Sequence, residues 1–216
     1  MLRPELTVLF APVRAGTVDV AHSFLDLAER EFWAQLKYGY SSLQLDPGKE
    51  DYHPFNETID RPSRDELMAR ISKDTNAMWG CDMLWYRELL AEVQIAVFRD
   101  TRGKLETTLM LIFDGKVTRL VEGDEEGRMP YVLFLCRIAE AIGSPWFVCG
   151  SHIRSWKPLS VDQVPGGRDL GHLYVVGWKR DSSVGEEFRS CFSLEPEGLG
   201  TTLLGYDFWA RFSLVD

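Results

Sequence analysis

Histidine is the side chain most often used for acid–base catalysis and for binding transition metals, and this chain has four of them. They are His22, His53, His152 and His172. An Asp-x-x-His spacing occurs twice, at Asp19–His22 and Asp169–His172, but two pairs of ligands do not make one metal centre. His22 falls on a predicted helix and His172 begins a predicted strand, so both are expected to be structural. His53 and His152 are the two that could take part in chemistry, and the sequence identifies a partner for neither.

The nucleophiles and glycine loops follow no catalytic pattern. The four cysteines, Cys81, Cys136, Cys149 and Cys191, have no C-x-x-C spacing, which argues against a zinc knuckle or a redox pair. Cys136 and Cys149 lie in apolar runs and are expected to act as small hydrophobic residues in a reducing compartment. The sequence has neither G-x-S-x-G nor H-E-x-x-H, and the glycines at 198–200 lack the third glycine of a dinucleotide loop. We therefore predict no catalytic, cofactor or metal site.

The distribution of charge is more informative than its total. The formal net charge is −9, from 24 basic and 33 acidic residues. Three segments, 46–66, 122–128 and 181–197, together hold 16 acidic and 5 basic residues, whereas the rest of the chain holds 17 acidic and 19 basic residues. Such acidity is typical of a solvated surface, or of a face that attracts a basic protein and repels nucleic acid and anionic membranes. The second interpretation predicts a protein partner with a basic surface, and neither nucleic-acid nor membrane binding.

The first third of the chain predicts one strand and two helices. An apolar run at 6–11 indicates a buried strand. Thr17 is expected to cap a helix that extends to about residue 38, with an apolar stripe that includes Ala21, Leu25 and Ala28. A polar segment at 40–62 is predicted to be a long loop, a feature that is often functional. The capping-box pattern at 63–66 then predicts a short helix over 64–72.

Alternating apolar residues in the middle of the chain predict an antiparallel meander. Its strands are expected at 92–100 and 105–113, with Asp114 and Gly115 turning the chain into a third strand at 116–122. Residues 78–86 are expected to add a fourth strand.

The second half of the chain adds a buried helix and further strands. The helix is predicted over 130–142, beginning at Pro130 and ending before Gly143. Further strands are expected at 146–149, 172–178 and 209–215. With no βαβα rhythm, the pattern indicates an α+β fold: a mainly antiparallel sheet with a central meander, packed by helices on at least one face. The length favours a single domain over residues 1–216.

Targeting signals are not evident in the sequence. The apolar run near the N-terminus is about six residues long and is interrupted by Pro12, which is too short for the core of a signal peptide. No stretch approaches the ~20 apolar residues of a membrane span. We therefore expect a cytoplasmic protein.

Aromatic and glycine residues recur in the C-terminal third, in the segments 143–150 (GSPWFVCG), 174–179 (YVVGWK) and 205–209 (GYDFW). In these segments the chain resembles the immunity proteins of bacterial polymorphic toxin systems, in particular those paired with nuclease toxins delivered by type VI secretion. The resemblance implies an antidote that binds its cognate toxin tightly in the cytoplasm and blocks the toxin's active site or substrate cleft. A small intracellular enzyme, or a phage or structural interaction protein, is the alternative.

A hypothesis for the interface follows from the acidic segments. We expect carboxylates of the 46–66 and 122–128 segments to face the basic residues that the toxin uses for DNA, and nearby aromatic residues to supply an apolar anchor. The acidic candidates are Asp51, Glu57, Asp60, Asp124, Glu125 and Glu126, and the aromatic candidates are Tyr52, Phe55 and Trp156.

Overall fold

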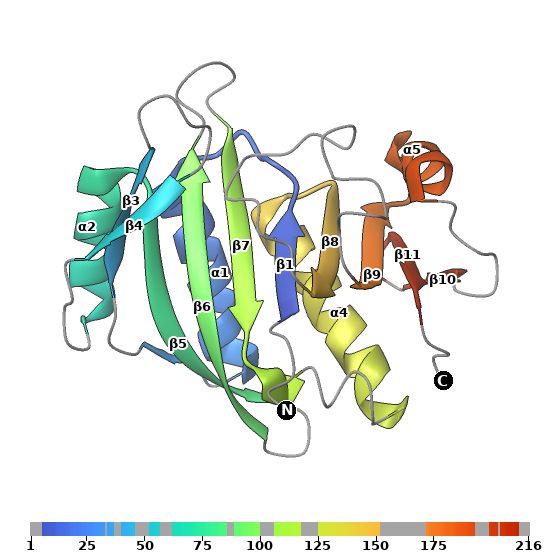
Figure 1. The fold of residues 1–216 in the computed structure, drawn as a ribbon, viewed down its shortest axis with the longest axis horizontal. Helices are drawn as coiled ribbons and strands as arrows, with labels where there is room; N and C mark the ends of the chain where they lie inside the picture. Colours follow the sequence, from blue (N-terminus) through green and yellow to red (C-terminus); the bar gives the residue numbers. More distant parts are fainter. Residues whose placement is uncertain are drawn as a thin grey trace. The chain divides into compact units, whose positions relative to one another are not determined.

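The computed structural model describes residues 6–32, 34–36, 40–45, 52–56, 62–85, 89–99, 106–117, 125–151, 172–192, 199–202 and 204–211. These residues form antiparallel strands with helices packed against them, so the predicted α+β class is confirmed (Figure 1). They group into two compact units. Unit 1 contains the described residues up to Ala11 and those from Phe113 onward, and unit 2 contains those from Pro12 to Ile112. That residues 1–216 form a single domain stays a prediction.

Unit 2 is built on a meander of long strands. Its strand order is β7 (Thr107–Phe113), β6 (Leu89–Arg99), β5 (Ala77–Trp85), β3 (Ser41–Leu45) and β4 (Tyr52–Asn56), and the short β2 (Gln35–Leu36) also pairs with β5. The predicted strands at 78–86, 92–100 and 105–113 are therefore confirmed as β5, β6 and β7. The register of β5 and β6 runs from Ala77 opposite Val97 to Trp85 opposite Leu89.

Helix α1 (Thr17–Phe32) packs against β5 and β6 and covers one face of this sheet (Figure 1). Its predicted apolar stripe is confirmed, since Ala21, Leu25 and Ala28 are buried. The helix ends six residues earlier than predicted, because residues 35–36 extend and pair with β5 as β2. Strand pairing therefore overrides a helical pattern that runs on to residue 38.

Helix α2 (Arg64–Asp74) begins at the predicted capping box. The Glu66 backbone N–H donates to the Ser63 hydroxyl at 3.3 Å, and the Ser63 N–H donates to the Glu66 carboxylate at 2.8 Å. The helix continues two residues beyond the predicted 64–72 and ends at Thr75, whose φ of 67° breaks the helical conformation.

Two predictions are wrong at the level of local structure, and the first concerns unit 2. The segment 40–62 is not a continuous loop, because β3 and β4 pair antiparallel within it, with Ser41 opposite Asn56 and Leu45 opposite Tyr52.

The second correction concerns the expected third strand of the meander, at 116–122. Residues 115–117 are helical instead. The Asp114 carboxylate accepts a hydrogen bond from the Lys116 N–H at 2.9 Å, and this local bond favours a turn over a ladder. Residues 118–122 lie outside the described residues.

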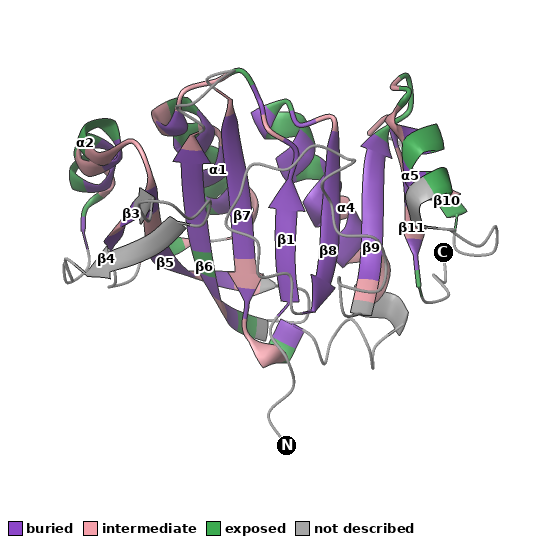
Figure 2. Cartoon of the chain, turned by 45° about the horizontal axis from the view of Figure 1, so that its top comes forward, coloured by how far each residue is buried: buried purple, intermediate pink, exposed green. Residues whose placement is uncertain are grey.

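Unit 1 is a second antiparallel arrangement, with helices on both faces. Its strand order is β10 (Leu199–Thr201), β11 (Tyr206–Ala210), β9 (His172–Lys179), β8 (Trp146–Ser151) and β1 (Leu6–Phe10). Helix α4 (Glu125–Ile142) covers the face that holds Cys149, and the Tyr131 hydroxyl lies 3.3 Å from the Cys149 sulfur. Helix α5 (Val184–Phe192) packs on the opposite side at one end of the strands, where Phe188 contacts Trp146 and Trp178. Most described residues of β1, β8 and β9 are accordingly buried (Figure 2).

Helix α4 starts five residues before the predicted Pro130, which therefore lies inside the helix. Two glutamates, Glu125 and Glu126, occupy its first turn, where acidic residues favour the positive end of the helix dipole. The predicted end is confirmed. Gly143 has a φ of 74°, its N–H donates to Glu140, and the next N–H donates to Ala139, the two bonds of a Schellman motif.

A buried polar contact ties the end of α4 to two strands of unit 1. The Tyr206 hydroxyl donates to the Ser144 carbonyl at 2.7 Å, and the Ser144 hydroxyl donates to the Trp146 carbonyl at 2.8 Å. Strand β11 begins at Tyr206, three residues before the start of the predicted strand at 209–215. Residues 212–215 of that prediction lie outside the described residues. Among the described residues, no helix is long and apolar enough to cross a membrane.

The glycine–aromatic pattern of unit 1 has a steric cause that can be tested at Gly177. A Cβ atom at this position would lie 2.3 Å from the ring of Phe147, which is fully buried and packed against Phe10. We expect Gly177→Ala to lower the free energy of unfolding by about 1–3 kcal/mol, because the buried ring cannot move away.

Denaturant unfolding of Gly177→Ala and wild type measures this effect. The control is Gly177→Ala in a Phe147→Leu background, where the smaller side chain leaves room and the cost should shrink. An equal cost in both backgrounds would contradict the steric explanation.

Candidate functional site

The structure describes the positions of some of the residues that we hypothesised to form the interface. Tyr52 and Phe55 lie in β4, the last strand in the order of unit 2, opposite Leu45 and Ser42. Glu125 and Glu126 lie in the first turn of α4. The remaining candidates are outside the described residues: Asp51, Glu57, Asp60, Asp124 and Trp156.

The histidines fall as follows. His22 lies on the exposed side of α1, and its Nδ1 atom is 3.0 Å from the Arg64 guanidinium. His172 begins β9 as predicted, and His53 lies in β4 rather than in a loop. His152 is outside the described residues. Within the described parts of the chain, no group of three or more His, Cys, Asp or Glu side chains is arranged to hold a metal ion.

A first polar cluster joins the two helices of unit 2. The Arg64 guanidinium of α2 donates to the carboxylates of Asp26 and Glu29 on α1, the latter at 2.9 Å. The hydrogen bond from Arg64 lowers the pKa of Asp26, although desolvation opposes the shift. Asp26 is therefore ionised at neutral pH and has no proton to donate. The cluster links α1 to α2, and its geometry favours a structural role.

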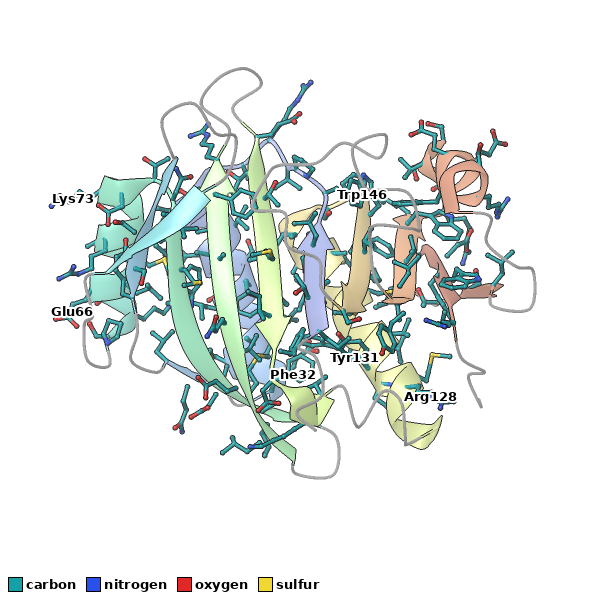
Figure 3. All side chains as sticks on the ribbon, viewed as in Figure 1. Phe32, Glu66, Lys73, Arg128, Tyr131 and Trp146 are labelled. Atoms are coloured by element: carbon teal, nitrogen blue, oxygen red, sulfur yellow. The ribbon has the colours of Figure 1, made fainter. Side chains whose placement is uncertain are left out.

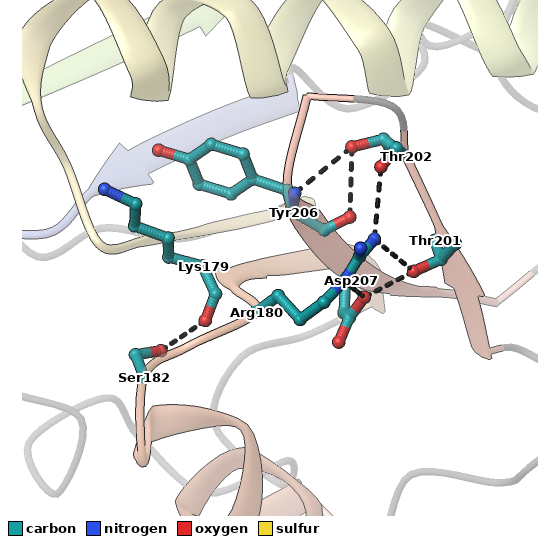
Figure 4. A network of polar contacts seen from close by, with 7 residues as sticks. All are labelled: Lys179, Arg180, Ser182, Thr201, Thr202, Tyr206 and Asp207. Atoms are coloured by element: carbon teal, nitrogen blue, oxygen red, sulfur yellow. Dashed lines mark hydrogen bonds and ion pairs between the residues drawn. The ribbon is translucent and has the colours of Figure 1, made fainter.

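A second polar cluster surrounds Arg180 in unit 1 (Figure 4). The guanidinium donates to the Asp207 carboxylate at 3.1 Å, to the Thr201 hydroxyl at 2.8 Å and to the Thr202 carbonyl at 3.2 Å. The Thr201 hydroxyl also donates to Asp207. Through these bonds the guanidinium connects the end of β9 to the β10–β11 hairpin. The arrangement therefore stabilises the local structure of this hairpin.

The described thiols are poor nucleophiles. Cys81, Cys136 and Cys149 are free and buried. Burial raises the pKa of each thiol to about 12. The neighbouring phenol of Tyr131, which points from α4 toward the strands (Figure 3), also has its pKa raised by burial. The thiols are thus protonated at physiological pH, and the expected hydrophobic role of Cys136 and Cys149 is confirmed.

Near Leu84 and Leu90, one face of strands β5 and β6 is at least partly exposed to solvent. Alternation directs Trp79, Cys81 and Met83 to the buried face that α1 covers. The opposite face carries side chains that are partly or fully exposed. We call this set the β5–β6 outer face: Gln35, Asp82, Leu84, Leu90, Glu92 and Gln94.

The β5–β6 outer face combines an apolar row with an acidic row. Leu84 lies opposite Leu90, whose relative exposure of 54% is the largest among the described large hydrophobic residues. One step along the same face, Asp82 lies opposite Glu92 on β6 and Gln35 on β2. This face therefore carries a pair of leucines next to a pair of carboxylates.

Sequence reasoning missed this face. Alternation along a strand relates residues that are two apart, but Asp82 and Glu92 are ten residues apart in the sequence. Only the register of β5 and β6 brings them together.

Comparison of the chain with protein-family models, with curated proteins and with solved structures finds no match.

Thiol reactivity tests the assignment of the cysteines. In a Cys191→Ser variant, the three buried thiols should react with a disulfide reagent at pH 8 only after denaturation. Their raised pKa keeps the proton bound well above this pH, and the thiolate is the reactive form. Absorbance of the released thiol reports the rate. Rapid reaction of the native variant would contradict the burial of at least one thiol.

Proposed function

We propose that this chain is a stoichiometric binding protein that neutralises a basic protein, and that its partner is a bacterial toxin. The observation that carries the proposal is the concentration of acidic residues in three segments of a chain that is otherwise close to neutral. Clustered charge of one sign raises the rate at which an oppositely charged protein docks and selects against the wrong partners. A nuclease toxin fits this proposal best, because a protein that binds DNA phosphates needs a basic surface.

The described backbone is compatible with an interface at two of these segments. Tyr52 and Phe55 lie on β4, the end strand of unit 2 among those described, and an end strand is a common place for another protein to dock. Glu125 and Glu126 open α4 in unit 1. We propose that these residues contact the toxin, together with Asp51, Glu57, Asp60, Asp124 and Trp156. An antidote that covers the DNA-binding surface of its toxin would prevent the toxin from reaching its substrate.

Co-expression tests the proposed function. The protein encoded by the neighbouring gene is expressed in host cells that this protein kills, once alone and once together with the present chain. We expect this chain to restore growth and to purify with that protein at a 1:1 ratio. The affinity should fall as salt rises, because the attraction is electrostatic. Continued killing, together with no complex in solution, would contradict the proposal.

Charge reversal locates the interface. Changing Asp124, Glu125 and Glu126 to lysine should slow association and weaken binding by at least tenfold, because it replaces attraction with repulsion. The matched control changes Asp181, Glu186 and Glu187, three exposed acids of the third acidic segment, to lysine. If the 124–126 variant binds with the same affinity and the same salt dependence as wild type, this segment is not part of the interface.

A further inference from the structure

We propose that the hydrogen bond between Tyr40 and Asp74 sets the orientation of the β3–β4 hairpin, and that both are positioning residues for partner binding at β4. The inference rests on the proposed function, because Tyr52 and Phe55 of β4 are among the residues proposed to contact the toxin. It identifies how unit 2 holds the strand that carries them.

The β3–β4 hairpin is attached to the sheet of unit 2 near its base. Strands β3 and β4 pair with each other along their whole length. Among the described residues, the pairing of β3 with β5 is limited to Ser41 opposite Met78 and Ser42 opposite Ala77. Contacts outside this short ladder must therefore fix the direction in which the hairpin leaves the sheet.

Tyr40, the residue before β3, supplies such a contact. Its side chain is fully buried, and its hydroxyl donates to the Asp74 carboxylate at 2.7 Å. The guanidinium of Arg70 lies 5.6 Å from the centroid of the Tyr40 ring, which is within the range of a cation–π contact. Helix α2, which packs beside β3 (Figure 1), therefore holds the base of the hairpin through a charge-assisted hydrogen bond and a ring contact.

The turn between α2 and β5 also holds β3 through its backbone. The Leu43 N–H donates to the Asn76 carbonyl at 3.0 Å, and the Asn76 side-chain oxygen accepts from the Arg99 N–H at 2.6 Å. Thr75 lies between Asp74 and Asn76, and its φ of 67° is unusual for a β-branched residue. Such a conformation persists only where the surrounding contacts impose it, so this turn is a rigid support for β3.

The position of Asp74 is unfavourable for the helix itself. Asp74 is the last residue of α2, where the negative end of the helix dipole disfavours a carboxylate. The hydrogen bond from the Tyr40 hydroxyl offsets this cost. Asp74 therefore serves the contact with the hairpin rather than the stability of α2.

Fixing the base of the hairpin also fixes the position of β4. In the strand order of unit 2, β4 reaches the other strands through β3, so a change in the direction of β3 carries β4 with it. A partner that docks along β4 needs this strand in one place, because ordering a loose strand on binding lowers the affinity. Loss of the bond between Tyr40 and Asp74 should therefore weaken binding even where the fold is kept.

Hydrogen exchange of the full-length protein tests the hold on the hairpin. Tyr40→Phe removes the hydrogen bond and keeps the ring. We expect the β3 and β4 amides, Leu43 included, to exchange roughly tenfold faster than in wild type relative to the β6 amides, which report overall opening.

The matched control for hydrogen exchange is Tyr206→Phe, which removes another phenol hydrogen bond of 2.7 Å, in unit 1. It should leave the ratio of hairpin to β6 exchange unchanged. A wild-type ratio in Tyr40→Phe, or the same rise of the ratio in Tyr206→Phe, would overturn the proposal.

Variants of Asp74 separate its position from its charge. Asp74→Asn keeps an acceptor for the Tyr40 hydroxyl and removes the negative charge, whereas Asp74→Ala removes both. The ligand is the protein encoded by the neighbouring gene. We expect Asp74→Asn to bind it as wild type does, and Asp74→Ala and Tyr40→Phe to bind it about fivefold more weakly or worse, because the hairpin must then be ordered on binding.

Two binding results would overturn the proposal. Equal losses in Asp74→Asn and Asp74→Ala would show that Asp74 acts through its charge. Wild-type affinity of Tyr40→Phe would show that the orientation of the hairpin does not matter for binding.

The proposed function and this inference fail in different ways. If the wild-type chain neither binds nor neutralises the neighbouring gene product, the antidote role is refuted, and hydrogen exchange still decides whether Tyr40 and Asp74 hold the hairpin. If the wild-type chain neutralises that protein and Tyr40→Phe binds it equally well, the positioning role is refuted and the antidote role stands.

Discussion

The alternation of side chains along β5 and β6 is the constraint on which the core of unit 2 depends. Successive residues of a strand face opposite sides, so the burial of Trp79, Cys81 and Met83 beneath α1 commits the residues between them to the other face. Asp82 and Leu84 therefore cannot be buried without exposing the core. A slip of one residue would bury carboxylates and expose the core side chains, and this cost fixes the register.

Much of the fold follows from local patterns in the sequence. The capping box at Ser63 and Glu66 and the stop at Gly143 are local, and both are confirmed. The end of α1 and the hairpin of β3 and β4 could not be predicted, because pairing with β5 decides them. Tertiary pairing thus outweighs local propensity at these segments.

The candidate site was less predictable than the fold. Clustered acidity in the sequence indicated a basic partner, but most of the hypothesised residues lie outside the described parts of the chain. Asp82 and Glu92 belong to none of the three acidic segments. They become a pair through the antiparallel register alone, a relation that composition and periodicity do not encode. Similarly, Arg180 could be recognised as a structural residue only once Asp207 and Thr201 were placed beside it.

The central claim is that an acidic face of this protein binds a basic partner. Its most direct test is the dissociation constant of the complex with the protein encoded by the neighbouring gene. This constant is measured at low and high salt for wild type and for the variant in which Asp124, Glu125 and Glu126 are changed to lysine. We expect the variant to bind at least tenfold more weakly at low salt, and the difference to narrow as salt screens the charges. Equal dissociation constants for the two proteins at low salt would contradict the claim.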